Sequence, residues 1–265
     1  MKKFLSITLI IIFSQFNIIN VYAGTDGSLE ISKKNKSNNE EVKDCFETVN
    51  RGIFAFNQGL DKIFFKPVAK GYRFLPKPIR SGTSNALSNL SNLITVPNNF
   101  LQGQFKDAGI NTLRFALNST LGIGGIFDVA SFYGLEKRDK EDYGQTLGTW
   151  GFQEGCYFVL PVLGPTTVRD SLGSLVNFSG GDAWYNVTVR NDTHYFSDFD
   201  YYASKGAGGV DFRAKNFDDI NNLEENSIDF YASVKSLYLQ DRRKRIANAS
   251  GSTQTQDDSD WEEIE

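Results

Sequence analysis

The sequence has few of the side chains on which metal binding and acid–base catalysis most often depend. It contains one histidine, His194, and two cysteines, Cys45 and Cys156. A lone histidine cannot build a zinc site without clustered partners, and no such spacing occurs. The two cysteines could pair in an oxidising compartment, but sequence alone leaves their pairing open. We therefore expect no metal site.

Motifs for covalent catalysis and for nucleotide binding are also missing. The sequence has no Gly-x-Ser-x-Gly elbow that would expose a serine nucleophile. The glycine-rich residues 122–125 lack the Lys-Ser/Thr pair of a phosphate-binding loop. We expect neither a catalytic residue nor a cofactor, so the protein is predicted not to be an enzyme.

Only the start of the chain has a long apolar run. Lys2 and Lys3 precede it, and Val21-Tyr22-Ala23 follows with small residues at the positions that signal peptidase reads. Residues 1–23 are therefore predicted to be a secretory signal peptide. A retained membrane anchor is the weaker alternative, because the strongly apolar part is about ten residues long and spanning takes about twenty.

The remaining composition is acidic and rich in aromatic residues. Without Lys2 and Lys3 the 28 basic residues fall to 26, against 32 acidic ones, so the net charge is −6. This balance argues against nucleic-acid binding. The 22 Phe and 11 Tyr are ample for a folded domain. Composition predicts a flexible linker over residues 24–43, one helical domain over 44–247 and a disordered acidic tail over 248–265.

Apolar spacing predicts the outer helices. The first starts at an Asp44–Glu47 capping box and ends at Pro67, with apolar residues every three or four positions: Phe46, Val49, Ile53, Phe56, Leu60 and Ile63. A second helix is expected over residues 79–93, with Pro97 breaking it. A last helix is expected over residues 227–247, with its inward side formed by Phe230, Val234, Leu237 and Tyr238.

Three shorter segments allow specific expectations. Gly144, Gly148 and Gly151 are spaced so that another backbone could come close, although a glycine-rich loop is the alternative. Pro165 is expected at the first position of a helix that contains Arg169-Asp170. Residues 242–245 are basic and would favour the helix C-terminal dipole, or else anionic lipid head groups.

The stretch from residue 106 to residue 119 predicts an unusual helix. Apolar side chains cover most of the cylinder, and Asn111, Arg114 and Asn118 form one narrow polar stripe. An ordinary surface helix has the opposite proportions. Two interpretations remain open: a lipid-facing helix whose polar stripe lines a wet channel, or a core helix with Arg114 paired to a carboxylate.

The next segment is rich in glycine. Gly122, Gly124 and Gly125 loosen the backbone while the side chains between them stay apolar. The segment is predicted to be a flexible joint, and a plain turn is the alternative.

Many short motifs together resemble the MlaA (VacJ) family. They occur in the family's order over residues 44–245 and include Asn50-Arg51, Lys66-Pro67-Val68-Ala69, Phe100-Leu101-Gln102-Gly103, Arg114-Phe115, Asn118-Ser119-Thr120-Leu121-Gly122-Ile123-Gly124-Gly125, Asp142-Tyr143-Gly144-Gln145-Thr146-Leu147-Gly148, Leu163-Gly164-Pro165, Arg169-Asp170 and Tyr238-Leu239-Gln240. The resemblance implies an all-α protein, in which amphipathic helices form a ring-shaped, membrane-embedded single domain.

The resemblance also implies a function and partners. Members of the family remove mislocalised phospholipids from the outer leaflet of the outer membrane through an amphipathic channel, and so maintain lipid asymmetry. They pass the phospholipid to the periplasmic carrier MlaC and commonly sit beside a trimeric porin. The alternative is a non-transporting amphipathic envelope protein that scaffolds partners at the membrane surface.

The sequence departs from the family at its membrane anchor. Members are typically acylated on a cysteine at the signal cleavage site, but Ala23-Gly24 offers no cysteine and the residues before Cys45 are no lipobox. We therefore expect export by a signal peptide to the periplasmic side of the outer membrane, without an acyl anchor.

Overall fold

Helices dominate the described part of the chain. The computed structural model describes residues 42–191 and 195–249, so the predicted signal peptide, the linker up to residue 41 and the tail from residue 250 lie outside it. The elements are α2 (Glu47–Leu60), η1 (Asp61–Phe65), α3 (Lys66–Arg73), α4 (Lys77–Leu101), α5 (Phe105–Thr120), α6 (Val129–Phe132), α7 (Tyr143–Thr149), β1 (Tyr157–Leu160), β2 (Gly164–Thr167), α8 (Val168–Val176), η2 (Asn177–Gly181), α9 (Ala183–Tyr185), η3 (Asn186–Arg190), α10 (Asp198–Lys215), α11 (Phe217–Asn226) and α12 (Phe230–Ala249).

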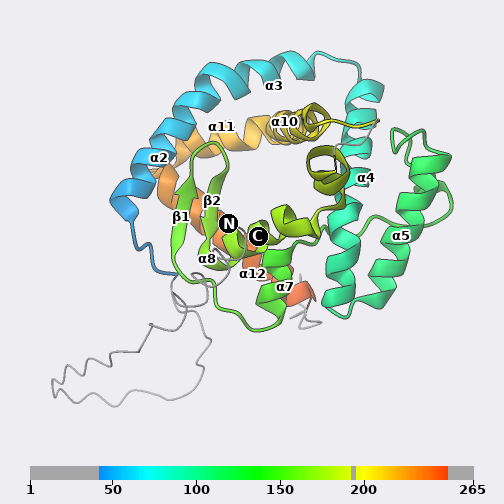
Figure 1. Ribbon diagram of the computed structural model, residues 1–265. Helices are drawn as coiled ribbons and strands as arrows, with labels where there is room; N and C mark the ends of the chain where they lie inside the picture. Colours follow the sequence, from blue (N-terminus) through cyan, green and yellow to red (C-terminus); the bar gives the residue numbers. More distant parts are fainter. Residues whose placement is uncertain (1–41, 192–194, 250–265) are drawn as a thin grey trace, which may run out of the picture. The chain divides into compact units, whose positions relative to one another are not determined.

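Contacts between these elements form a closed circuit. Helix α3 packs on α10, α10 on α4, α4 on α7, α7 on α12 and α12 on β2, while β1 packs on α2. Figure 1 shows this succession around the described part of the chain, with α5 packed on α4 outside the circuit. The predicted all-α class and the ring of helices are confirmed.

The first helix begins and continues differently from the prediction. Its N-cap is Phe46, which makes no side-chain capping bond, so the Asp44–Glu47 capping box is wrong. Asp44 instead accepts a hydrogen bond from Asn50 Nδ2 at 2.6 Å. Pro67 does not end the helix, because the π-helical turn η1 precedes it and Pro67 falls in the first turn of α3. A proline at that position costs the helix little.

Helix α4 is also longer than predicted. Pro97, which was expected to break it, lies inside it. Tertiary contacts on both sides of this proline hold the helix together. Asn92, before Pro97, accepts a hydrogen bond from Lys140 Nζ at 2.7 Å. Asn99, after Pro97, accepts one from Asn111 Nδ2 at 2.9 Å. Packing on neighbouring segments therefore outweighs the local preference of proline to break a helix.

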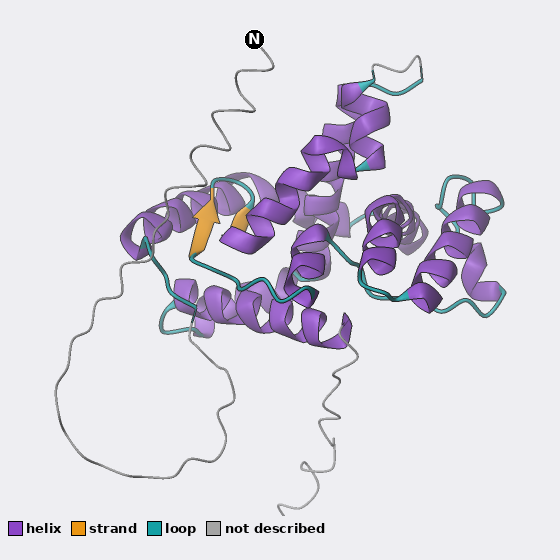
Figure 2. Cartoon of the chain, turned by 60° about the horizontal axis from the view of Figure 1, so that its bottom comes forward, coloured by secondary structure: helices purple, strands orange, loops and turns teal. Residues whose placement is uncertain are grey.

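A β-hairpin replaces the turn and helix start predicted around Pro165. Strands β1 and β2 pair antiparallel, with Tyr157 opposite Thr167 and Val159 opposite Pro165. They form a two-stranded sheet among helices, drawn in orange in Figure 2. Pro165 thus lies in an edge strand, where a missing N–H is tolerated. Helix α8 begins at Val168, and Thr167 Oγ1 caps it by accepting from the Asp170 N–H at 3.2 Å.

Two asparagines of α2 hold the hairpin. Asn50 donates to the Tyr157 carbonyl at 3.2 Å and accepts from the Val159 N–H at 3.0 Å. Asn57, two helical turns later, donates to the Leu160 carbonyl at 2.9 Å and accepts from the Val162 N–H at 2.7 Å. The two amides thereby satisfy backbone groups that an edge strand would leave unpaired.

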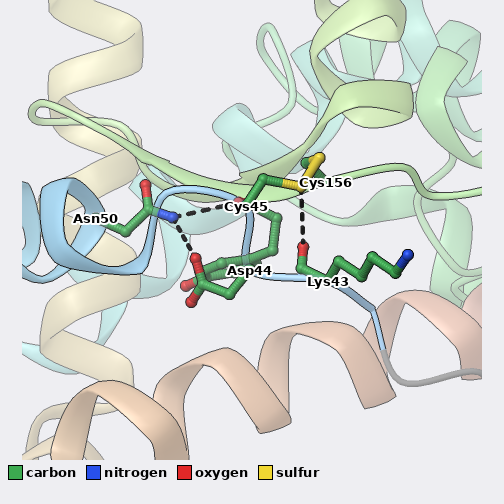
Figure 3. The surroundings of a disulfide bond; sticks show 6 residues. Lys43, Asp44, Cys45, Asn50 and Cys156 are labelled. Atoms are coloured by element: carbon green, nitrogen blue, oxygen red, sulfur yellow. Dashed lines mark hydrogen bonds between the residues drawn. A yellow bond between two sulfur atoms is a disulfide. The ribbon is translucent and has the colours of Figure 1, made fainter.

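A disulfide fastens the same junction, which settles the pairing that the sequence left open. Cys45 and Cys156 are bonded, with their Cα atoms 5.6 Å apart and a sequence separation of 111 residues. Figure 3 shows the disulfide beside Lys43, Asp44 and Asn50. The Tyr157 N–H also donates to the Lys43 carbonyl at 2.9 Å. The start of the described chain is therefore fixed to β1 by both kinds of bond.

The last helix, α12, starts three residues later than predicted. Its fully buried residues are Tyr231, Leu239, Arg242 and Ala249. Of the four residues expected to point inward, three are half-buried and Leu237 is 52% exposed, although all four line one cavity. Tyr231 and Leu239 belong to a small apolar core with Val42, Tyr157 and Val159.

Polarity elsewhere in the described residues is inverted. The fully buried side chains include many amides and hydroxyls, among them Asn50, Asn98, Asn99, Asn111, Thr95, Thr146 and Thr188. Large apolar side chains are exposed instead, including Ile63, Phe74, Phe105, Phe132 and Leu163. None of the helices within 42–191 and 195–249 is long and apolar enough to cross a membrane.

Candidate functional site

A polar cavity of about 230 Å³ lies between α4, α5 and the segment that follows them. Its lining is made of amides, one hydroxyl and charged groups: Asn85, Ser88, Asn89 and Asn92 from α4, Asn111, Arg114 and Asn118 from α5, and Asp128, Lys137, Arg138 and Lys140 from the following segment. The structure thus brings Asn111, Arg114 and Asn118, the three residues predicted to line a channel, to one cavity.

Helix α5 has the inverted polarity that its sequence predicts. Asn111, Arg114 and Asn118 are 1%, 5% and 5% exposed, whereas Leu113 is 54% and Phe105 is 69% exposed. The polar stripe faces α4 and the cavity, and the apolar surface faces outward. The side chains that line the cavity therefore come from the inner edge of an otherwise apolar helix.

Arg114 has a carboxylate partner, as the core-helix interpretation required. Its Nη2 donates to Asp128 Oδ1 at 2.7 Å, and its Nη1 donates to the Leu135 carbonyl and to Ser131 Oγ. Asn118 Nδ2 also donates to Asp128 Oδ1, at 3.1 Å. The guanidinium also lines the cavity.

The hydrogen bonds to Asp128 fix its charge. Burial alone would raise its pKa, but hydrogen bonds from Ser131, Arg114 and Asn118 outweigh burial and lower the pKa to about 2. Lys137 Nζ lies 3.4 Å from the other carboxylate oxygen. Asp128 is therefore ionised at neutral pH and holds several donors of the cavity in place.

An amide network joins α4 to α5. Asn89 Nδ2 donates to Ser119 Oγ at 2.8 Å, and Asn111 Nδ2 donates to Asn99 Oδ1 at 2.9 Å. Asn99 Nδ2 in turn donates to Gln104 Oε1 at 2.6 Å. The sequence analysis did not identify the asparagines of α4. Asn85, Asn89 and Asn92 are spaced four and three apart, which places them on one helix face.

The lysines of the cavity were also missed. Lys140 Nζ donates to the Ser88 carbonyl at 2.9 Å and to Asn92 Oδ1 at 2.7 Å. Burial lowers the pKa of Lys140 to about 8, and the positive charges of Arg114 and Lys137 add to this effect. The sequence feature that could have identified these lysines is the basic run Lys137-Arg138-Asp139-Lys140, which follows α5 and its polar stripe in the sequence.

The three glycines of the predicted joint have different surroundings. A Cβ on Gly122 would lie 2.3 Å from the Phe127 carbonyl oxygen and 2.5 Å from that of Asn118. Gly125 has a φ of 96°, and its Cβ would meet the Asn89 side chain at 2.5 Å. Gly124 has a φ of 67° but faces open space. Close packing therefore demands glycine at two positions, and only backbone conformation demands it at the third.

The basic end of the last helix is occupied by ion pairs. Arg242 donates to Asp142 Oδ2 at 2.6 Å and to Asp170 Oδ1 at 2.9 Å, and it is buried. Arg243 pairs with Glu154 at 3.1 Å and Arg245 with Asp241 at 2.8 Å. For Arg242, both the helix-dipole role and the lipid-headgroup role were wrong. Its buried guanidinium binds Asp142, at the start of α7, and Asp170 of α8.

Beside Arg242 the predicted close backbone approach is present. A Cβ on Gly173 of α8 would lie 2.3 Å from the backbone nitrogen of Gly144 in α7. A Cβ on Gly144 would in turn meet Asp170 Oδ1 at 2.6 Å. Gly151, in contrast, has a φ of 90° and open space around it, so it serves a turn and not a helix contact.

The described residues offer no metal centre. No group of three or more His, Cys, Asp or Glu side chains is placed to hold an ion within 42–191 and 195–249. His194 lies outside the described residues.

Comparison with known proteins decides the family. The sequence model of the MlaA lipoprotein family matches residues 42–245. The chain belongs to the MlaA family. The intermembrane phospholipid transport system lipoprotein MlaA of Escherichia coli K12 is 34% identical over 212 residues, which cover 77% of this chain and 78% of that protein. The MlaA of Haemophilus influenzae is 30% identical over 217 residues, covering 78% and 80%.

Two further similarities cover nearly the whole of the other chain. An uncharacterised protein of Rickettsia prowazekii is 34% identical over 248 residues, which cover 92% of this chain and 94% of that one. A solved structure from work on the structural basis for maintenance of bacterial outer membrane lipid asymmetry aligns with a TM-score of 0.65 and 32% identity. It covers 77% of this chain and 99% of that one. MlaA relatives are thus similar in both sequence and fold.

Proposed function

We propose that this protein transports phospholipid between membranes. It would remove mislocalised phospholipids from the outer leaflet of the outer membrane through an amphipathic channel and pass them to a periplasmic carrier of the MlaC kind. Relatives that are intermembrane phospholipid transport lipoproteins support this role. No chemical step on the lipid is needed, in keeping with a sequence that has no catalytic motif.

The observation that carries the proposal is the inverted polarity. Each large apolar side chain left in water forgoes about 1.5–3 kcal/mol of burial free energy. Such side chains are exposed on successive elements, for example Ile63, Phe74, Phe105 and Phe132. Acyl chains around these elements would recover that free energy, while the buried amides and charges offer a polar route for head groups.

The second candidate function is a non-transporting scaffold at the membrane surface. Exposed apolar helices alone would serve either function, because both require the protein to hold a membrane. The polar cavity favours transport, since a scaffold has no need of buried cations between α4 and α5. A trimeric porin remains a candidate partner under both functions.

A transfer assay tests the proposal against the scaffold. The purified protein is reconstituted in donor vesicles with labelled phospholipid, and a periplasmic carrier is added. We expect the label to reach the carrier faster than from vesicles that lack the protein. Equal rates with and without a correctly folded, membrane-bound protein would rule out transport and leave the scaffold.

Anchoring is tested separately. We propose that the protein is held at the periplasmic side of the outer membrane by its apolar helices and begins near Gly24 without acyl chains. Carbonate and high-salt washes should leave it in the membrane pellet, and mass spectrometry should find an unmodified N-terminus. Release into the soluble fraction would contradict embedding, and an acylated N-terminus would contradict the missing anchor.

A further inference from the structure

The cavity between α4 and α5 has more positive than negative charge. Arg114, Lys137, Arg138 and Lys140 line it, and Asp128 is the one carboxylate of that lining. A second carboxylate, Asp107, reaches Arg138 from the side at 3.3 Å. Four cations therefore face two carboxylates, and both carboxylates are committed to contacts with arginine.

Lys140 is left with neutral partners. Asp128 accepts from Arg114, Asn118 and Ser131, whereas Lys140 donates to a carbonyl and an amide oxygen of α4. No ion pair joins Lys140 to a carboxylate in the described part of the chain. An ammonium has three donors, and these contacts use two of them. A half-buried cation beside Arg114 and Lys137 is unfavourable unless an anion joins it.

The cavity suits a small oxyanion better than an acyl chain. Its volume of about 230 Å³ is below the roughly 300–1,000 Å³ of sites that enclose a drug-sized ligand. Amides and charged groups dominate the lining, and three of the asparagines come from one face of α4. Amide N–H groups together with lysine and arginine are the donors that hold phosphate oxygens.

We propose that this cavity binds a tetrahedral oxyanion of the phosphate class, with Lys140 as the cation in contact with it. Arg114 would act as a second donor that Asp128 holds in position. The inference rests on the proposed function where the oxyanion is the phosphate of a lipid head group. A free oxyanion has the same chemistry, and the experiment separates the two sources.

The site has a built-in pH dependence. Burial lowers the pKa of Lys140 to about 8, the charges of Arg114 and Lys137 lower it further, and Asp128 opposes them. An anion in contact would favour the charged form. Binding therefore takes up a proton at pH values above 8, and affinity falls as the pH rises further. Ser88 and Asn92, the partners from α4, do not titrate in this range.

The test uses two probes and matched lysine variants. Sulfate serves as the free probe, because its charge is constant across the pH range, and a short-chain phosphatidylglycerol below its micelle concentration is the lipid probe. Binding is measured by calorimetry on the detergent-solubilised full chain. Lys140→Met removes the charge at similar volume, Lys140→Arg keeps the charge, and Lys70→Met changes an exposed lysine of α3 as the control.

We expect wild type and Lys70→Met to bind at least one probe. Lys140→Met should weaken that binding about ten- to a hundredfold, as loss of a charge-assisted contact predicts. Lys140→Arg should bind more tightly than Lys140→Met. Wild-type affinity should fall about tenfold from pH 7 to pH 9.5, and the fall should vanish in Lys140→Met. Binding of the lipid probe alone assigns the site to head groups, and binding of sulfate alone assigns it to free oxyanions. Binding of both probes assigns it to both sources.

Two outcomes would overturn the inference. One is a wild-type protein that binds neither probe, and the other is a Lys140→Met variant that binds as wild type does. Loss of a charge without an ion-pair partner should leave the thermal midpoint unchanged or raise it, so an unfolded variant is not the expected complication. Transfer measured on the same preparations keeps the two proposals apart. A protein that transports lipid but binds no probe fails only here, and one that binds but does not transport fails only in its proposed function.

Discussion

Arg114 and Asp128 form an ion pair of 2.7 Å across the glycine-rich turn that separates them in sequence. Both side chains are largely buried, at 6% and 16% exposure, and both line the polar cavity. The carboxylate holds the guanidinium at the cavity wall, and the guanidinium closes the turn that carries the carboxylate. Structural and functional roles of Arg114 must therefore be separated by experiment.

The first prediction separates those roles through a double-mutant cycle. Arg114→Gln removes the closer of the two cations at the largely buried Asp128 and leaves only Lys137, at 3.4 Å, so it should cost up to about 3–5 kcal/mol of stability. Adding Asp128→Asn removes the stranded charge and should restore a large part of that loss. If Arg114 also contacts passing phosphate, the double variant should be folded yet slow in lipid transfer. Thermal unfolding and transfer are measured on the same preparations.

Arg114→Lys completes that series. Lysine keeps the charge but lacks the paired donors, so we expect intermediate transfer and a moderate loss of stability. Wild-type transfer per folded molecule in the double variant would show that Arg114 is structural only. A stable Arg114→Gln variant with normal transfer would refute both roles.

The second prediction concerns the glycine turn. Gly124→Ala places a Cβ in open space at a positive φ and should cost about 1–2 kcal/mol. Gly122→Ala forces a Cβ into two carbonyl oxygens, so its loss of stability should be clearly larger. If the segment moves during transport, Gly124→Ala should slow transfer beyond what its stability explains. Transfer that scales with the folded fraction in both variants would identify a rigid turn.

The third prediction concerns the disulfide. A bond that closes a loop of about 100 residues stabilises by roughly 4–5 kcal/mol in the chain-entropy account. A variant with Cys45→Ser and Cys156→Ser should therefore unfold at a temperature lower by about 8–20 °C. Each single variant serves as the control and should match the double variant. If reducing agent leaves the wild-type midpoint unchanged, the bond contributes nothing to stability.

Local pattern was a good guide where one helix face decided the structure. The period of Asn111, Arg114 and Asn118 correctly predicted that these residues share one face of a helix, and the structure shows that face to be buried. Proline misled the prediction three times, at Pro67, Pro97 and Pro165, because long-range contacts or a π-helical turn accommodate it. The asparagines that hold β1, Asn50 and Asn57, have partners more than 100 residues away. No local window contains such partners, so the hairpin could not be predicted.

The cavity shows the same limit in its charges. Lys140 contacts Ser88 and Asn92, which lie 52 and 48 positions earlier in the chain. Sequence alone presents Lys140 as one of several exposed basic residues. Only the fold shows that Lys140 is half-buried and has no carboxylate partner among residues 42–191 and 195–249. Arg242 was mistaken for a surface residue for the same reason, since Asp142 and Asp170 come from two other helices.

The last prediction is a pH dependence set by two neighbouring carboxylates. Burial raises the pKa of Glu141 to about 7, although a hydrogen bond from Gln102 opposes it. For Asp142 burial acts in the same direction, but hydrogen bonds and charge from Arg242 outweigh it and lower the pKa to about 2. The stability from Asp142 is present above its unfolded pKa of about 3.9 and is lost as the pH falls through 2. The stability from a protonated Glu141 is fully present below its unfolded pKa of about 4.3 and is lost as the pH rises through 7.

The free energy of unfolding should therefore be greatest between about pH 4 and 5 and decline towards neutral pH. Glu141 is buried, so Glu141→Gln should remove a decline of about 3 kcal/mol. Glu136→Gln, at an exposed position in the same segment, should keep the decline and is the matched control. Denaturant unfolding at pH 4.5, 6 and 7.5 measures all three proteins. Only a pKa of Glu141 that folding raises makes the free energies of unfolding of wild type and Glu141→Gln diverge with pH. If the two free energies change in parallel, Glu141 ionises freely in the folded protein.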